Sequence, residues 1–224
     1  VKDGWLKITP IEIKLTADSK SKQYDGTPLT KNSYTMTGAF VNGEGLQSVT
    51  VVGSQLLVGE SANTITKYAL KENTKAQNYS ITVWPGKLTV TDRTEKYVIT
   101  VKAKSGEKTY DGKPLTVSGL KDTEFTVNGQ KYTVEGLSAS KEGTNVFDSG
   151  AVVIVGTEIV RDKAGNDVTK QFTVKRVDGT LTIKQREVVL TSESAKKQYD
   201  GTPLTRPDVT VDGTFVEGEV SDVT

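Results

Sequence analysis

Tyr24-Asp25-Gly26-Thr27-Pro28-Leu29-Thr30 is a phrase of seven residues that this chain uses three times. It returns as Tyr110-Asp111-Gly112-Lys113-Pro114-Leu115-Thr116 and as Tyr199-Asp200-Gly201-Thr202-Pro203-Leu204-Thr205. The intervals are 110 − 24 = 86 and 199 − 110 = 89 residues. Such intervals exceed the roughly 20–50 residues of a solenoid repeat and match the size of a small domain. The sequence therefore predicts domains of one type joined end to end.

Each copy of this phrase has the residue types of a tight turn. Asp-Gly bends the chain, Pro fixes φ, and Leu returns to the core. The tyrosine is expected to bury its ring and to hydrogen-bond through its hydroxyl. The predicted structural turn motif comprises Tyr24, Asp25, Gly26, Pro28 and Leu29, then Tyr110, Asp111, Gly112, Pro114 and Leu115, and finally Tyr199, Asp200, Gly201, Pro203 and Leu204. A calcium site is disfavoured because one carboxylate per turn falls short of the roughly 6–8 oxygens that calcium needs.

Alternating apolar residues on both sides of these turns predict strands with one buried face. Ile11-Glu12-Ile13-Lys14-Leu15 precedes the first turn, and similar runs at 97–101 and 188–190 precede the other two. Two further runs, 79–83 and 86–91, are separated by Pro85 and recur at 172–175 and 179–184. Because a tight turn separates the runs of each pair, we expect a closing hairpin in each unit. Another hairpin is expected around Asn128-Gly129.

These patterns divide the chain into four expected parts. Residues 1–9 are the end of a preceding repeat, 10–92 and 93–184 are two repeat modules, and 185–224 are the truncated start of a third repeat. The expected fold is all-β, with tandem Ig-like or β-sandwich modules in an elongated array. Modules of the β-grasp type are the alternative, but they need a helix. The one candidate, residues 71–77, is short and poorly apolar.

Composition argues against an enzyme, a metal centre and a polyanion partner. The chain has no Cys and no His, so the commonest general base and metal ligand are both missing. Its formal net charge is +1, from 29 basic and 28 acidic side chains, which gives no electrostatic grip on nucleic acid. No apolar run reaches the roughly 20 residues of a membrane helix. We expect no catalytic, cofactor or metal residues and no membrane insertion.

Three lysines, Lys22, Lys108 and Lys197, stand two residues before the three tyrosines. In some bacterial surface domains a buried lysine attacks an Asn or Asp side chain and forms an internal amide crosslink, for which Asn78 is the candidate acceptor. The interpretation that we favour is solvated charge on a strand edge, which discourages aggregation. The two tryptophans, Trp5 and Trp84, are expected to pack between domains rather than to stack on sugars.

The phrases Tyr-Asp-Gly-x-Pro-Leu-Thr at the start of a unit and Asn78-Tyr79-x-Ile81 before Gly86-x-Leu-Thr-Val-Thr at its end resemble the tandem YDG/MBG-type repeats of Gram-positive bacterial cell-surface proteins. The segment 165–169 before Phe172 is also similar to that family. The resemblance implies an extracellular, adhesin-like stalk, attached to the cell wall through parts of the parent protein outside this sequence. It brings no catalytic residues.

Two functions follow as hypotheses. In the first, which we favour, the repeats are structural spacers that project a distal binding region from the cell wall, and their partners are neighbouring repeats of the same chain. In the second, the repeats are themselves an adhesive module that binds a host glycan, mucin or matrix protein.

Overall fold

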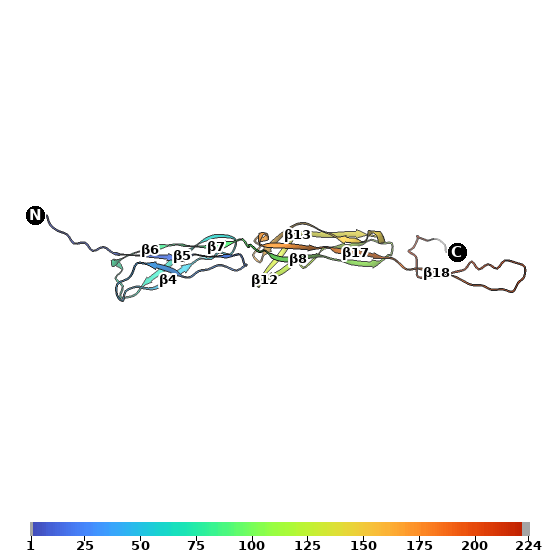
Figure 1. Ribbon diagram of the computed structural model, residues 1–224, viewed down its shortest axis with the longest axis horizontal. Coiled ribbons are helices and arrows are strands. Elements are labelled where there is room, and N and C mark those ends of the chain that lie inside the picture. The colour runs from blue at the N-terminus through green and yellow to red at the C-terminus, as the bar shows by residue number, and fades with distance from the viewer. Residues whose placement is uncertain (1, 221–224) are drawn as a thin grey trace. The chain divides into compact units, whose positions relative to one another are not determined.

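The computed structural model describes residues 2–220, and its chain is all-β, as the sequence predicted (Figure 1). Strands make up 53% of it and helix only 4%, the latter as the 3-10 turns η1 (Ala76–Asn78), η2 (Val146–Asp148) and η3 (Thr169–Gln171). The strands are β1 (Ile11–Ala17), β2 (Lys20–Gln23), β3 (Tyr34–Thr37), β4 (Leu46–Val52), β5 (Gly59–Leu70), β6 (Tyr79–Trp84), β7 (Gly86–Thr91), β8 (Tyr97–Ala103), β9 (Gly106–Thr109), β10 (Leu115–Ser118), β11 (Leu120–Lys121), β12 (Glu124–Val127), β13 (Gln130–Gly143), β14 (Gly150–Val152), β15 (Ile154–Asp162), β16 (Phe172–Val177), β17 (Gly179–Lys184), β18 (Val189–Ser192) and β19 (Val209–Asp212).

Backbone proximity divides the described chain into two compact units. Unit 1 holds residues 2–98, 124–133 and 159–173, and unit 2 holds residues 99–123, 134–158 and 174–220. Unit 1 therefore joins residues from both repeat modules that the sequence predicts, and each unit is described by itself below.

The first part of unit 1 is a β-sandwich. One sheet has the order β3-β1-β6 and the other the order β2-β7-β5-β4. In the first sheet, β1 lies antiparallel to β3 and parallel to β6. In the second, β2 lies parallel to β7, and β5 lies antiparallel to both of its neighbours. The chain thus changes sheet between β1 and β2 and again between β6 and β7.

Alternation along β1 builds the core between these two sheets. Ile13, Leu15 and Ala17 point inward, with Glu12 and Lys14 exposed on the other face. They pack in one cluster with buried side chains from the other strands, namely Val51, Ile65 and Tyr79. Full burial of a side chain such as that of Ile13 or Leu15 stabilises the fold by about 1.5–3 kcal/mol. β1 is also the middle strand of its sheet.

The closing hairpin expected from the sequence is wrong. β6 and β7 follow one another across Pro85, but they belong to different sheets, and β16 and β17 are separated in the same way. Proline lacks the N–H that a hairpin turn would use. Gly86 then enters the second sheet against the Ala17 carbonyl, where a Cβ atom would clash with the backbone. The tight turn carries the chain across the sandwich instead of reversing it within one sheet.

Unit 2 repeats part of this arrangement. β9 lies parallel to β17 with Leu181 opposite Gly106, as β2 lies parallel to β7 with Leu88 opposite Lys20. β14 completes that sheet on the other side of β17. Val101, Val152 and Leu181 are fully buried. Near the C-terminal end, β18 and β19 pair with one another.

The hairpin around Asn128-Gly129 is confirmed. β12 and β13 pair antiparallel with Val127 opposite Gln130, and both turn residues have positive φ, 49° and 74°. Positive φ at both positions is typical of the two-residue turn that suits strand twist. The helix that a β-grasp module would need is not found in the candidate segment, because residues 71–77 contain only the start of η1.

The close approach of Gly86 to the Ala17 carbonyl gives a first prediction. Gly86→Ala is expected to lower the free energy of unfolding by about 1–3 kcal/mol, because the added Cβ meets backbone that has no room to move. Gly4 occupies the matching sequence position, and no atom of residues 2–220 lies within 4 Å of a Cβ added to it, so Gly4→Ala is the control. Urea denaturation measures both, and equal midpoints for the two variants would contradict the clash.

Candidate functional site

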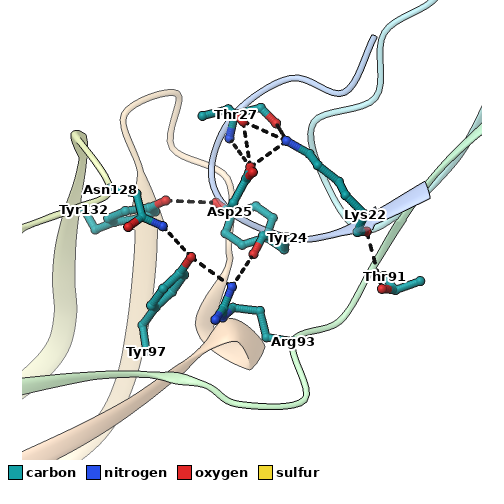
Figure 2. A network of polar contacts seen from close by, with 9 residues as sticks. All are labelled: Lys22, Tyr24, Asp25, Thr27, Thr91, Arg93, Tyr97, Asn128 and Tyr132. Carbon is teal, nitrogen blue, oxygen red and sulfur yellow. Dashed lines mark hydrogen bonds and ion pairs between the residues drawn. The ribbon is translucent and has the colours of Figure 1, made fainter. Parts of the chain in front are cut away.

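The first Tyr-Asp-Gly turn is closed by one carboxylate, as Figure 2 shows. The Oδ1 atom of Asp25 accepts hydrogen bonds from the Thr27 N–H at 2.8 Å, from the Thr27 hydroxyl at 2.7 Å and from Lys22 Nζ at 2.6 Å. Lys22 Nζ also donates to the Thr27 carbonyl and hydroxyl, each at 2.7 Å. Gly26 between them has φ of +79°, which glycine adopts without strain.

The same closure recurs in the other two copies. Asp111 accepts from the Lys113 N–H at 3.0 Å and from Lys108 Nζ at 2.5 Å. Asp200 accepts from the Thr202 N–H at 2.9 Å and from Lys197 at 2.7 Å. The glycines have φ of +73° and +80°. The turn is therefore a local structure that each copy builds from its own residues.

We had expected solvated charge on a strand edge, but each of the three lysines bonds to the aspartate of its own turn. Lys22 lies on β2, an edge strand, but its ammonium is half-buried and bonded to Asp25 and Thr27. Lys108 and Lys197 bind their own turns in the same way. Asn78, the candidate crosslink acceptor, lies exposed in η1 and has no bond to Lys22 among the described residues. The ammonium groups thus act as clamps on the aspartates.

These clamps lower the pKa of each aspartate. Burial by itself raises the pKa of Asp25, but the hydrogen bonds from Lys22 and Thr27 outweigh it, and the pKa lies below 3.8. The Lys108 ammonium lowers the pKa of Asp111, helped by the Lys113 N–H. The pKa of Asp200 is lowered by Lys197 and Thr202. All three turns therefore favour the ionised carboxylate.

The tyrosine of the first copy does not enter the core cluster around β1. Its side chain is 1% exposed and lies with its hydroxyl 3.5 Å from the hydroxyl of Tyr132, which is 2% exposed. Tyr132 in turn packs edge-on against Phe172, with ring centroids 4.8 Å apart. Burial raises the pKa of both tyrosines, and the contact with Tyr132 raises that of Tyr24 further. Both hydroxyls are therefore neutral at physiological pH.

Gly26 makes this contact possible. A Cβ atom at this position would clash with the Tyr132 hydroxyl. Glycine is thus required here twice, for its positive φ and for the close approach of β13.

Arg93 joins the connector after β7 to the same turn (Figure 2). Its Nη1 atom donates to the Tyr24 carbonyl at 3.0 Å and to the Tyr97 hydroxyl at 2.9 Å. Its Nε atom donates to the Glu95 carbonyl at 2.8 Å, and the guanidinium lies 3.8 Å from the centre of the Tyr97 ring. Asn128 donates to the Tyr97 hydroxyl at 2.6 Å. Arg93 therefore joins the turn to the connector directly, and it joins both to the β12–β13 loop through the Tyr97 hydroxyl.

The remaining connector residues are also bonded. The buried Gln171 accepts from the Arg93 N–H at 3.0 Å and donates to Asp92 at 2.6 Å. Gln23 donates to the Thr94 hydroxyl at 3.2 Å. A cleft of about 460 Å³ beside this connector is lined by Tyr24, Leu57, Val58, Asp92 and residues 167–171.

Unit 2 contains a related site around the second copy. Arg186 Nε donates to the Tyr110 carbonyl at 3.1 Å, and its Nη1 donates to the Thr214 carbonyl at 2.9 Å. The Tyr110 hydroxyl donates to Glu219. A Cβ atom at Gly112 would lie 2.8 Å from Val216 Cγ1. As at the first turn, an arginine binds the tyrosine carbonyl and a side chain lies close over the glycine. The residues that cover the turn are different here, namely Val216 and Glu219.

The third copy has the turn without these neighbours. Tyr199 is 94% exposed, and an added Cβ at Gly201 has no atom within 4 Å among the described residues. Its lysine and aspartate nevertheless bond as in the other copies. The turn therefore does not depend on the packing around it.

Sequence reasoning found the turns but missed the residues that pack on them, Arg93, Gln171, Tyr132, Arg186 and Glu219. A signal was present for the arginines, because each stands two residues after the end of a Gly-x-Leu strand, at Thr91 and Lys184. For Tyr132 and Glu219 there was none, because Tyr132 lies on β13 and Glu219 lies after β19, in segments of unlike sequence.

Among residues 2–220, no group of three or more acidic side chains is placed to hold a metal ion, and no helix is long and apolar enough to cross a membrane.

The difference in burial between the copies gives a second prediction. Tyr24→Ala is expected to lower the free energy of unfolding by about 3–5 kcal/mol, as for other large buried aromatics. Tyr199→Ala removes the same side chain from a 94% exposed position. It is expected to change the free energy of unfolding by less than about 0.5 kcal/mol. Thermal unfolding compares the two, and a similar loss for both would show that burial is not the cause.

A third prediction concerns pH. Because the folded pKa of Asp25 lies below 3.8, its contribution is complete above pH 3.8 and is lost as the pH falls through the folded pKa. At pH 7, Asp25→Asn is expected to lower the free energy of unfolding by about 1–2 kcal/mol, and this difference should shrink as the pH falls from 3.8 towards about 2. Urea denaturation at both pH values measures it. The control is Asp3→Asn, at an exposed position outside the strands. A difference that persists at low pH would exclude the charge as its origin.

Comparison with known proteins found a match for one part of the chain. No curated protein and no solved structure matches the chain. Residues 13–89, which run from β1 into β7, match the model of a family described as the MBG domain (YGX type), and this match supports an MBG-type domain in that part of the chain.

Proposed function

We propose that this chain supplies structural spacer repeats of a bacterial surface protein, which project a distal binding region from the cell wall. The match of residues 13–89 supports a surface-associated repeat domain. The three equally closed Tyr-Asp-Gly turns support a repeated unit. Extracellular location and attachment to the wall through other parts of the parent protein are included in this proposal.

The observation that carries the proposal is the bonded connector of unit 1. Asp92, Arg93, Thr94 and Glu95 each make a hydrogen bond through side chain or backbone. A flexible linker would leave these groups to water. A connector fixed in this way resists bending between the first sandwich and the β12–β13 loop, which is the property that a spacer needs.

The recurrence of the arginine in unit 2 supports the same function. Arg186 binds the Tyr110 carbonyl as Arg93 binds the Tyr24 carbonyl. In both places the arginine stands just after a strand that pairs in parallel with the strand before the turn. A device used twice at equivalent positions suits an array of similar units.

The chemistry of the chain also fits a spacer better than an enzyme. MBG domains and all-β folds of this kind are typical of non-catalytic domains. The geometry that recurs in the three turns places a carboxylate against an ammonium, which satisfies both charges and leaves neither group poised for proton transfer.

One observation favours the second function, an adhesive module. Trp84 is 54% exposed on β6, with Lys14 Nζ 4.7 Å from its ring centre. A groove of about 510 Å³ is lined by Trp84 and Ile13 together with polar residues that include Glu12, Thr37 and Ser80. An exposed indole with polar neighbours suits a saccharide. A glycan and mucin array with the full chain discriminates, because a spacer binds nothing there, whereas an adhesive module loses its binding in Trp84→Ala.

The bonded connector gives a fourth prediction. In the wild-type chain, ¹⁵N relaxation is expected to give β1 and β12 the same rotational correlation time, since both belong to unit 1. Arg93→Ala removes the bonds to Tyr24 and Tyr97 and is expected to give β12 a shorter correlation time than β1. Arg206→Ala is the control, because that arginine forms ion pairs with Glu193 and Asp208, away from the connector. Equal times in Arg93→Ala would contradict a fixed connector.

A further inference from the structure

We propose that the first sandwich of unit 1 resists tensile force, because its first and last strands pair in parallel and therefore meet a pull on the chain in shear. The proposal deepens the spacer function and rests on it, since a spacer that is fixed at one end transmits the force that acts on the other. It concerns bonds within one sandwich and needs no wall, ligand or second chain for its test.

Two segments of the sandwich run side by side in the same direction. The entry segment, residues 11–24, contains β1 and β2, and the exit segment, residues 79–91, contains β6 and β7. β1 lies parallel to β6, with Ile11 opposite Tyr79, and β2 lies parallel to β7. Both segments pass from the first sheet into the second, so they are paired in parallel on both sides of the crossing.

This pairing decides how a pull on the chain acts. The chain enters the strands of the sandwich at Ile11 and leaves them at Thr91. Because the two segments are parallel, these residues lie at opposite ends of the paired strands. A pull on both therefore slides one segment along the other and strains the hydrogen bonds of both strand pairs together. A pull on two residues at the same end breaks the bonds one after another.

Bonds outside the strands extend the β2–β7 pair at both ends. Before β2, the Ser19 Oγ accepts a hydrogen bond from the Lys87 N–H at 2.9 Å. After β2, the Tyr24 N–H donates to the Thr91 carbonyl at 2.9 Å, and the Tyr24 carbonyl accepts from Arg93 at 3.0 Å. β2 itself has only four residues, so these bonds lengthen the part of the pair that a pull must break.

Packing opposes the same sliding movement. At the crossing, a Cβ atom on Gly86 would lie 2.3 Å from the Ala17 carbonyl oxygen, so the two segments are in backbone contact there. Leu15 on the entry segment and Leu88 on the exit segment are both fully buried. Because protein cores are closely packed, the segments slide only if these side chains leave their places in the core.

Unit 2 contains the same bonds around its own parallel pair, β9 and β17. The Ser105 Oγ accepts from the Thr180 N–H at 3.0 Å. The Tyr110 N–H donates to the Lys184 carbonyl at 2.9 Å, and the Tyr110 carbonyl accepts from Arg186 at 3.1 Å. A serine before the pair and a tyrosine and an arginine after it therefore belong to the repeated design and not to one unit.

Single-molecule force spectroscopy of the full chain tests the proposal. The chain has no cysteine, so two introduced cysteines fix the points where the force acts. Thr9→Cys with Lys96→Cys loads the two segments in shear. Thr9→Cys with Gln77→Cys is the control, because Thr9 and Gln77 each stand two residues before their strand and a pull there peels β1 from β6. All three positions are exposed. The rupture force is expected to be at least about twofold higher in shear, since several hydrogen bonds share the load.

An alanine variant in the shear-loaded chain tests one of the bonds. Ser19→Ala removes the acceptor of the Lys87 N–H and is expected to raise the unfolding rate at constant force about fivefold, as the loss of one hydrogen bond does. Ser21→Ala, at an exposed position on β2, is the matched control and is expected to leave the rate unchanged. Under the peeling load, Ser19→Ala is expected to have little effect, because β1 and β6 separate first.

Equal rupture forces for the two cysteine pairs overturn the proposal, and so does an effect of Ser19→Ala no larger than that of Ser21→Ala. Neither result touches the spacer function, because the relaxation measurement on Arg93→Ala tests that function separately. Thermal unfolding without load shows that each variant folds.

Discussion

The close approach of Tyr132 to Tyr24 over Gly26 determines the arrangement at the end of the first sandwich. Because no side chain projects from Gly26, the strand β13 comes close enough for the two tyrosines to bury each other. The carbonyl of Tyr24 then faces Arg93, whose guanidinium has the donors to bind it and the Tyr97 hydroxyl together. A side chain in place of the glycine would push Tyr132 away from Tyr24 and would also disturb the bond between Arg93 and the Tyr24 carbonyl.

The aspartate clamp makes this approach reliable. A turn with positive φ at its glycine is strained for most sequences, and its backbone N–H groups need partners. Asp25 satisfies the Thr27 N–H and is itself neutralised by Lys22, so the turn exposes little unpaired charge to the buried tyrosines. In the third copy, where Tyr199 is exposed among the described residues, the lysine and the aspartate bond in the same way. Local chemistry therefore prepares the surface on which distant residues pack.

The sequence predicted what is local and repeated. Alternation placed β1, β8 and β18, and Asn128-Gly129 predicted its hairpin, because strand and turn preferences act within a few residues. It failed at β6 and β7, where the turn residues at 85 and 86 indicate a bend but not the sheet that the chain enters next. The sequence also predicted a solvated Lys22, because its bond to Asp25 exists only once the turn has formed. The partners Tyr132 and Gln171 depend on long-range packing, which no single-chain pattern encodes.

The turn is the constant half of the contact, and the residues that cover it vary. At Gly26 the partner is an aromatic hydroxyl from a strand, and at Gly112 it is a valine from a loop. In each case the tyrosine hydroxyl meets an oxygen, from Tyr132 or from Glu219. A surface that requires only a small apolar approach and one oxygen accepts loops of different sequence. That tolerance explains how the middle of a repeat can change while Tyr-Asp-Gly, the lysine before it and the arginine after β7 or β17 stay in place.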